Sequence, residues 1–352
     1  IKSLSEFCKD FEIYVLCMDK ETKFLLEKIN IKQVKCIDIK AVENEALLDV
    51  KGKRTNAEYC WTMASSFTWY LINKFDGIDL ITYLDADLLF FSNVEPIFKE
   101  IKNSSIAIIE HRFSDSFRHL EVNGRFCVEW NSFRRDKEGL KCLNTWRKQC
   151  IEWCYYKLED GKLGDQKFLD EWPNKYQSCH IIKEEGAGIA PWNYSQYHIE
   201  NEYPNITING RKLVFYHFHQ FKILKNNKFF RLGSIYTSIK KEPDSIYKIY
   251  EENKLSPYFF IDNISLAKDG LDSFATSTKA FPDICSFSAA LASKAPLMHQ
   301  PGEKYTYSMG MDILGCVIER ASGKTFEKMK NIDGETAQSG YLKVEPSFES
   351  SV

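Results

Sequence analysis

The segment "DLITYLDADLLFFS" at residues 79–92 does most to limit the possible folds of this chain. Its apolar first half, 79–84, predicts a strand, and two aspartates, Asp85 and Asp87, follow it directly. On an extended backbone, residues i and i+2 point to the same side, so the two carboxylates would share one face. Two like charges repel unless something positive lies between them, and a divalent cation is the expected partner. The alternative is a solvated strand exit or a helix cap.

Predicted strands and helices alternate along the first part of the chain. We expect strands at 11–17, 34–39, 79–84, 105–110 and 125–135, and helices at 21–29, 57–74, 95–101 and 138–160. This alternation is typical of an α/β fold with a mainly parallel sheet flanked by helices. Ligands of such sheets bind beyond the carboxyl ends of the strands, and Asp85 and Asp87 lie at an end of that kind.

The middle part of the chain is less regular and contains other polar groups. A loop at 164–173 leads into a short helix, "GAGIAPWN" at 186–193 predicts a glycine-rich turn, and 212–224 predicts a strand with His217 and His219 on one face. Mn²⁺ and Mg²⁺ take carboxylate and diphosphate oxygens, and one imidazole nitrogen is compatible with Mn²⁺. Either histidine could instead have a purely structural role.

Charge and composition exclude several classes of protein. With 47 basic and 49 acidic residues the net charge is only −2, which argues against nucleic-acid binding as the main function. The sequence has no run of 18 apolar residues and no signal peptide, so we expect no transmembrane segment and a cytoplasmic location, with peripheral membrane contact left open. The eleven cysteines include no Cys-x-x-Cys pair, which favours reduced thiols in the core.

The stretch "YLDADLLFFSNVEPIF" resembles the metal-binding strand exit of GT-A-fold glycosyltransferases. It is similar in particular to a bacterial group that is related to the glycogenin-like transferases and is associated with cell-surface polysaccharide assembly. Further matching stretches follow in the same order and together cover roughly residues 5–240: "AEYCWT", "EHRF", "CIEWCYYKLEDGKLGDQKFLDEWP", "GAGIAPWN" and "FYHFHQFKI". The resemblance implies a Mn²⁺ or Mg²⁺ cofactor, a nucleotide-sugar donor such as a UDP-sugar, and a glycan acceptor. It also implies that the first strand of the domain lies upstream of Ile1.

The resemblance assigns metal binding to residues at matching positions. Asp85 and Asp87 would hold the cation that bridges the phosphates of the donor, and His217 would be the third protein ligand. Because His219 points the same way, the two histidines could exchange roles. The related enzymes continue with a glycine and a lysine, but here Gln220 takes the place of the glycine. Lys222 and Lys225 could therefore contact a phosphate only from a shifted position.

Other matching positions concern the sugars. Asp165 and Gln166 match an Asp-Gln pair that lies near the reacting sugar in the related enzymes. Asp165 could also, or instead, be a helix N-cap, because it precedes "QKFLDEW". Trp192, in the glycine-rich turn, would offer an apolar platform to a sugar, although a core tryptophan in a tight turn fits the same pattern.

The character of the sequence changes near residues 255–265, and we expect a transferase domain at 1–255 and an appended segment at 256–352. Within that segment, 294–328 resembles a fragment of a class C β-lactamase-like serine hydrolase or esterase. Tyr307 matches the tyrosine that helps to activate the serine in that family. However, Met309 replaces the expected asparagine, and "TSTK" has Thr276 where a serine is needed. We expect a partial, mainly helical, non-catalytic appendage.

Three functions follow from these observations. The first is metal-dependent transfer of a sugar from a nucleotide sugar to a glycan or cell-surface polysaccharide. The second is a serine hydrolase that uses Tyr307, and an ordinary helical appendage is the competing explanation of that segment. The third is a degenerate, non-catalytic protein that only binds a sugar nucleotide.

Overall fold

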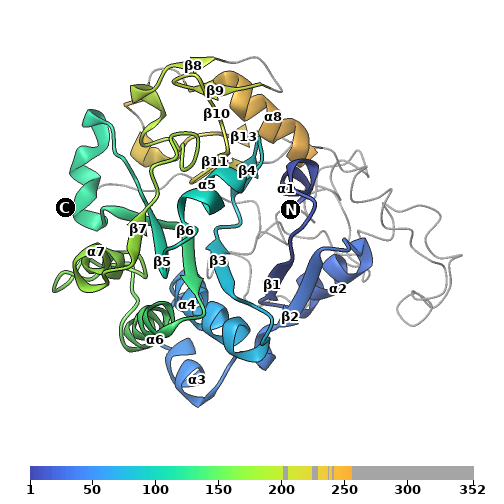
Figure 1. Ribbon diagram of the computed structural model, residues 1–352, viewed down its shortest axis with the longest axis vertical. Coiled ribbons are helices and arrows are strands. Elements are labelled where there is room, and N and C mark those ends of the chain that lie inside the picture. Colours follow the sequence, from blue (N-terminus) through green and yellow to red (C-terminus); the bar gives the residue numbers. More distant parts are fainter. Residues whose placement is uncertain (201–204, 224–228, 237, 240–241, 256–352) are drawn as a thin grey trace, which may run out of the picture. The chain divides into compact units, whose positions relative to one another are not determined.

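A computed structural model describes residues 1–200, 205–223, 229–236, 238–239 and 242–255 (Figure 1). The chain divides into two compact units, of which the first comprises Ile1–Lys23, Asn30–Phe221 and Arg231–Glu252. In the second unit, β12 (Lys222–Ile223) pairs antiparallel with β13 (Phe229–Phe230). The predicted appendage at 256–352, with Thr276, Tyr307 and Met309, lies outside the described residues, and the boundary at residue 255 stays a prediction.

The N-terminal part alternates strands and helices, as the sequence predicts. Its elements are α1 (Lys2–Phe7), β1 (Ile13–Cys17), α2 (Lys20–Ile29), β2 (Val34–Asp38), η1 (Ile39–Ala41), α3 (Glu45–Lys51) and α4 (Asn56–Lys74). Strands β1 and β2 pair in parallel, with Ile13 opposite Val34. Helix α4 begins at a capping box in which Thr55 and Glu58 each bond the backbone N–H of the other. This box satisfies two N–H groups that a helix start otherwise leaves unpaired.

The sheet beside the candidate site has the strand order β3-β6-β5-β7. These strands are β3 (Leu80–Leu84), β5 (Ile106–Glu110), β6 (Phe126–Arg134) and β7 (Cys179–Ile181). Strand β6 is antiparallel to both β3 and β5, and only β7 is parallel to β5. The prediction of a mainly parallel sheet is therefore wrong for this sheet. The 3₁₀ segment η2 (Asp115–Asn123) lies in the connection from β5 to β6, which returns the chain antiparallel to β5.

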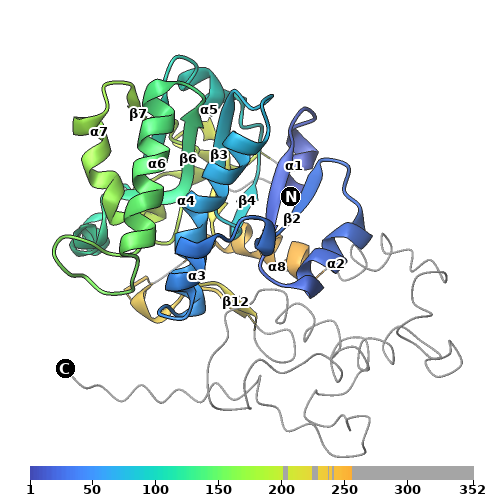
Figure 2. The same ribbon diagram turned by 90° about the horizontal axis from the view of Figure 1, so that it is seen from below.

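Helices α4 and α6 (Lys137–Glu152) run side by side along one face of this sheet (Figure 2). Trp146 of α6 is fully buried and stacks on Phe133 of β6, with ring centroids 5.9 Å apart. Burial of such large aromatic side chains contributes about 1.5–3 kcal/mol each, and it fixes the helix on the sheet.

Helix α6 ends earlier than the predicted helix at 138–160. Two side chains, one just before α4 and one in its first turn, form hydrogen bonds with backbone groups at and beyond the end of α6. Arg54 donates to the carbonyl of Ile151 at 2.6 Å, and the Glu58 carboxylate accepts from the Tyr156 N–H at 2.8 Å. Because these partners replace helical hydrogen bonds, the chain leaves the helix after Glu152.

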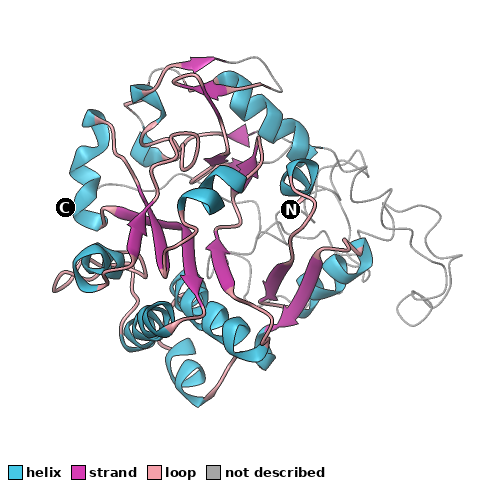
Figure 3. Ribbon diagram, in the orientation of Figure 1, coloured by secondary structure: helices cyan, strands magenta, loops and turns pink. Residues whose placement is uncertain are grey.

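The remaining elements are short except for α8, and loops (pink in Figure 3) connect them. They are β4 (Leu88–Phe90), α5 (Glu95–Glu100), η3 (Lys167–Glu171), α7 (Trp172–Lys175), η4 (Tyr194–Gln196), β8 (Ile199–Glu200), β9 (Thr207–Ile208), β10 (Arg211–Lys212), β11 (Phe215–His217), η6 (Ser234–Tyr236) and α8 (Asp244–Leu255). The predicted strand at 212–224 is therefore broken. Gln220 has a φ of 62°, a left-handed conformation that turns the chain out of the strand.

The described residues thus form a mixed α/β structure with helices packed on a sheet. None of the helices in these ranges is both long enough and apolar enough to cross a membrane.

A candidate metal centre

Backbone hydrogen bonds bring the exit of β3 next to β11. The N–H of Asp85 donates to the carbonyl of Glu129 in β6 at 3.3 Å, and the carbonyl of Asp87 accepts from the N–H of Phe218 at 3.0 Å. His217, in β11, lies opposite Leu88 of β4 in an antiparallel register. Segments that are far apart in the sequence therefore meet at the point where the two aspartates leave the sheet.

The side chains of Asp85, Asp87 and His217 converge at this point. Nε2 of His217 lies 3.0 Å from Oδ1 of Asp87 and 3.9 Å from Oδ2 of Asp85. One ligand atom from each residue lies within 4.8 Å of the other two, so the group could hold a metal ion. The imidazole is buried, whereas the aspartate side chains are 28% and 30% exposed, so the carboxylates are partly buried and partly accessible to solvent. Tyr83 donates to Oδ1 of Asp85 at 3.0 Å and holds that carboxylate.

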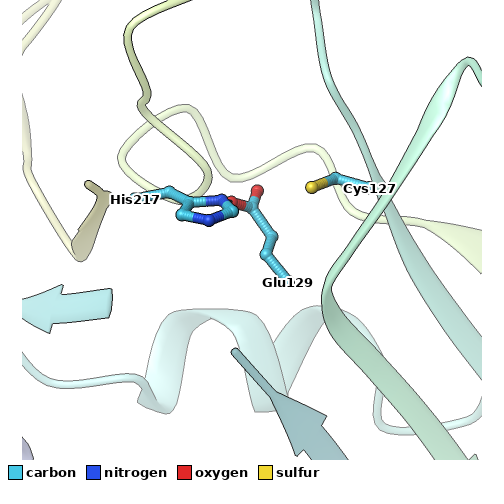
Figure 4. A group of neighbouring side chains, drawn as sticks. All are labelled: Cys127, Glu129 and His217. Carbon is cyan, nitrogen blue, oxygen red and sulfur yellow. The ribbon is translucent and has the colours of Figure 1, made fainter. Parts of the chain in front are cut away.

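On its other side, His217 contacts a carboxylate that the sequence analysis missed. Nδ1 of His217 lies 2.5 Å from Oε2 of Glu129, whose side chain is completely buried (Figure 4). Cys127, Glu129 and His217 form a second group of possible ligands. Burial raises the pKa of the Cys127 thiol above its usual range, so the thiol is protonated in the metal-free protein. The signal that could have identified Glu129 is its acidic side chain in the middle of the predicted strand, "RFCVEWNSF".

His219 lies beside this group but has another partner. Its Nδ1 is 2.5 Å from the hydroxyl of Tyr236, and its ring centroid is 5.8 Å from that of His217. Burial, reinforced by the charge of His217, lowers the pKa of His219 to about 4, so this ring is neutral near pH 7. Within the described residues, His217 is the histidine that belongs with the two aspartates.

Without a metal, the protonated imidazole of His217 offsets part of the negative charge of the two aspartates. Burial opposes ionisation of Asp87, but the charge and hydrogen bond of His217 outweigh it and lower the pKa of Asp87 to about 2. Burial raises the pKa of Asp85 to about 6 against the attraction of His217. Burial also disfavours the imidazolium, yet the charge of Asp87 and its hydrogen bond hold the pKa of His217 well above its usual value. The protonated imidazole thus supplies the positive charge that a bound cation would otherwise supply.

Asp165 lies near Asp85 but does not cap a helix. The N-cap position of η3 is occupied by Gln166, which makes no side-chain cap bond. The indole N–H of Trp146 fixes the backbone here, because it donates to the carbonyl of Asp165 at 2.9 Å. Burial, followed by the charge of Asp85, raises the pKa of Asp165 to about 8, so its carboxyl group is mainly protonated at pH 7. The amide of Gln166 donates to the carbonyl of Asn123 at 3.0 Å.

Replacing Asp165 with asparagine is expected to change how stability depends on pH in the metal-free protein. The folded-state pKa is raised from 3.8 to about 8, so the folded protein loses stability as the pH rises through this interval. The slope from this group is at most about 1.4 kcal/mol per pH unit. We expect Asp165→Asn to be about as stable as the wild type at the acid end and more stable at the alkaline end.

Urea unfolding in the presence of EDTA at several pH values measures this difference. Asp115→Asn is a suitable control, because the side chain of Asp115 is 92% exposed. An equal pH slope in Asp165→Asn and in the wild type would mean that Asp165 ionises normally.

Two other predicted site residues have different surroundings. Trp192 is only 4% exposed, its indole N–H donates to the carbonyl of His111 at 2.8 Å, and its ring lies edge-on to His217. The indole ring therefore packs against the imidazole, and little of its surface is exposed for contact with a sugar. Lys222 is exposed and belongs to the second unit. Roles for Trp192 and Lys222 in donor binding stay predictions.

No protein-family model matches the sequence. Two proteins of Bacillus subtilis (strain 168), both described as uncharacterized, are similar to it. YfnD is 32% identical over 232 residues, which are 65% of this chain and 75% of YfnD. YfnF is 31% identical over 259 residues, which are 71% of this chain and 84% of YfnF. Among solved structures, apo mouse xyloside xylosyltransferase 1 matches 61% of this chain and 88% of its own, with 14% identity and a TM-score of 0.37, which is too low to establish a shared fold.

Proposed function

This chain belongs to the family of YfnD and YfnF, and we propose that it is a metal-dependent glycosyltransferase. The donor in this proposal is a nucleotide-diphosphate sugar, in the first place a UDP-sugar, and the acceptor is a glycan or cell-surface polysaccharide. A GT-A fold for the transferase domain, a cytoplasmic location and Mn²⁺ or Mg²⁺ as the cofactor are parts of the same proposal. The observation that carries it is the convergence of Asp85, Asp87 and His217 at the exit of a strand.

The ligand types of this group fit a divalent cation. Mn²⁺ accepts carboxylate oxygens together with an imidazole nitrogen, and Mg²⁺ prefers the oxygens. Asp85 and Asp87 are partly exposed, so they could hold a cation on a side that is open to phosphate oxygens, while the buried His217 completes the protein side. The same group is what the resemblance to GT-A-fold enzymes leads one to expect from "YLDADLLFF".

The residues around the group have separate tasks in this proposal. When bound, the cation would stabilise the negative charge that develops on the leaving diphosphate. Tyr83 holds the Asp85 carboxylate by its hydrogen bond. Asp165, with its proton retained at neutral pH, can donate a hydrogen bond to a sugar hydroxyl or phosphate oxygen, as a neutral buried carboxyl group does. The chain otherwise has to orient the donor and acceptor, which is the main requirement of such a transfer.

Release of UDP from a panel of UDP-sugars tests the proposal. We expect the purified protein to release UDP in the presence of Mn²⁺ or Mg²⁺, to stop when EDTA is added, and to resume when excess Mn²⁺ is restored. Release that continues in EDTA would contradict a metal-dependent reaction. Tight binding of UDP-sugars without any release would favour the non-catalytic alternative. Turnover of nitrocefin or a p-nitrophenyl ester would favour a hydrolase that uses Tyr307.

A further inference from the structure

Glu129 holds the imidazole of His217 from the side opposite the two aspartates. We propose that Glu129 is a positioning residue that fixes the orientation and tautomer of His217 and thereby raises the metal affinity of the Asp85–Asp87–His217 group. This inference rests on the proposed function, because it assumes that this group binds a cation.

The backbone of β6 directs Glu129 toward the site. Strand β6 pairs regularly with β3, where Trp130 lies opposite Leu84, but its pairing with β5 shifts register. Cys127 lies opposite Ile109 whereas Asn131 lies opposite Ile108, so the residues between them, including Glu129, bulge from the ladder. Bulges occur beside functional sites because they redirect a side chain. In the same stretch the carbonyl of Glu129 accepts from the N–H of Asp85. Glu129 therefore contacts Asp85 through its backbone and His217 through its side chain.

The contact between Glu129 and His217 determines which ring nitrogen faces the metal. A neutral imidazole carries one proton, and a carboxylate beside Nδ1 retains that proton there. Oε2 of Glu129 is 2.5 Å from Nδ1, and Nε2 points toward Asp87 on the other side of the ring. A cation that displaces the Nε2 proton would therefore meet the lone pair of Nε2, while the other proton stays on Nδ1. Without the carboxylate the ring could place its proton on Nε2, rotate, or do both.

The surroundings of Glu129 argue against a merely structural carboxylate. Its side chain is fully buried, and no lysine or arginine of the described residues forms an ion pair with it. Its second oxygen, Oε1, has no hydrogen-bond partner in this part of the chain. Burying a carboxylate is costly unless it is paired, so a residue that only fills space here would be apolar. The contact that accounts for Glu129 is the one with His217.

The group of Cys127, Glu129 and His217 offers a competing explanation, in which a metal binds inside the protein (Figure 4). That arrangement would need Nδ1 and Oε2 as metal ligands. In the structure these two atoms are 2.5 Å apart, which is a hydrogen-bond distance and leaves no room for an ion between them. We therefore favour positioning by Glu129 over a second metal site.

Direct titration of the full chain with Mn²⁺, without a donor, tests the inference by calorimetry or by the electron paramagnetic resonance of free Mn²⁺. We expect Glu129→Gln, which keeps the shape but loses the charge, to bind Mn²⁺ about 10- to 100-fold more weakly than the wild type. Glu129→Asp keeps the charge but is one methylene too short to reach Nδ1, and we expect a loss of affinity there too. The control is Glu43→Gln, another little-exposed glutamate, at 8%, and its Mn²⁺ affinity should be unchanged.

Wild-type affinity in both Glu129→Gln and Glu129→Asp would overturn the inference. Co²⁺ adds a second readout, because a thiolate ligand gives an intense charge-transfer band. A band that disappears in Cys127→Ser would place the metal in the buried group and would also overturn the inference, whereas its absence agrees with positioning. Failure of the proposed function looks different: the wild type would then bind no Mn²⁺, or would bind it equally well after Asp87→Asn.

Discussion

Replacing Asp87 with asparagine is expected to lower metal-dependent UDP release on the order of 10³-fold or more, because it removes a charged ligand of the cation that stabilises the leaving diphosphate. The fold should survive. The backbone contact of Asp87 with Phe218 does not depend on the side chain, and asparagine has nearly the same shape. In the folded protein the pKa of Asp87 is lowered to about 2, so its ion pair with His217 contributes stability at pH 7 that is lost as the pH falls from 3.8 toward 2. The variant should lose roughly 2 kcal/mol at pH 7.

Measurements of UDP release and of thermal unfolding on the same preparation separate these two effects. Asp76→Asn is the matched control, because the side chain of Asp76 is fully exposed and lies 3.8 Å from Arg135. It should keep both activity and stability. An Asp87→Asn protein with full metal-dependent turnover would mean that the cation binds elsewhere.

Replacing Gly188 with alanine is expected to destabilise the protein by about 2–5 kcal/mol and to weaken metal binding. Gly188 has a φ of +69°, which costs an L-residue about 1–2 kcal/mol. A Cβ at this position would lie 2.6 Å from Cδ1 of Ile109, 2.8 Å from Oε1 of Glu129 and 2.9 Å from Nη2 of Arg112. Relieving these overlaps in a packed region adds about 1–3 kcal/mol and moves the carboxylate that contacts His217.

The chain provides a close control for this substitution. Gly210 has a similar φ of +78°, but a Cβ there would meet no atom within 4 Å. Gly210→Ala should therefore show the conformational cost alone, and Gly188→Ala should show that cost together with the overlap. Urea unfolding measures both variants, and calorimetric titration with Mn²⁺ shows whether the site is disturbed. Equal losses of stability in the two variants would refute the role assigned to close packing around Gly188.

The individual elements were largely predictable from the sequence, but their pairing was not. Local patterns identified β1, β2, β3, β5, β6, α4 and α5 to within a few residues. The direction of β6 depends on how the chain returns after η2, and no local pattern contains that information. The early end of α6 likewise depends on Arg54, which bonds Ile151 from 97 positions away. Periodicity reports on neighbours in the sequence, so it cannot reveal such partners.

The candidate site was likewise predictable from local sequence only in part. The spacing of Asp85 and Asp87 after an apolar strand predicted their common orientation, because that follows from backbone geometry alone. That His217 joins them, with His219 turned toward Tyr236, depends on the antiparallel pairing of β4 and β11. Glu129 was visible only as an unexplained charge inside a strand. Its role became apparent when the bulge in β6 and the position of His217 were known.

The contact between Glu129 and His217 joins residues that are 88 positions apart, so the complete site can arise only after a large chain loop has closed. A partly folded chain would retain the two acidic residues but would lack the imidazole. A metal ion that binds only the complete site should stabilise the fully folded state by RT ln(1 + [M]/Kd), where [M] is the free metal concentration and Kd its dissociation constant. This stabilisation would appear only at the end of folding. Metal occupancy would then distinguish fully folded molecules from folding intermediates.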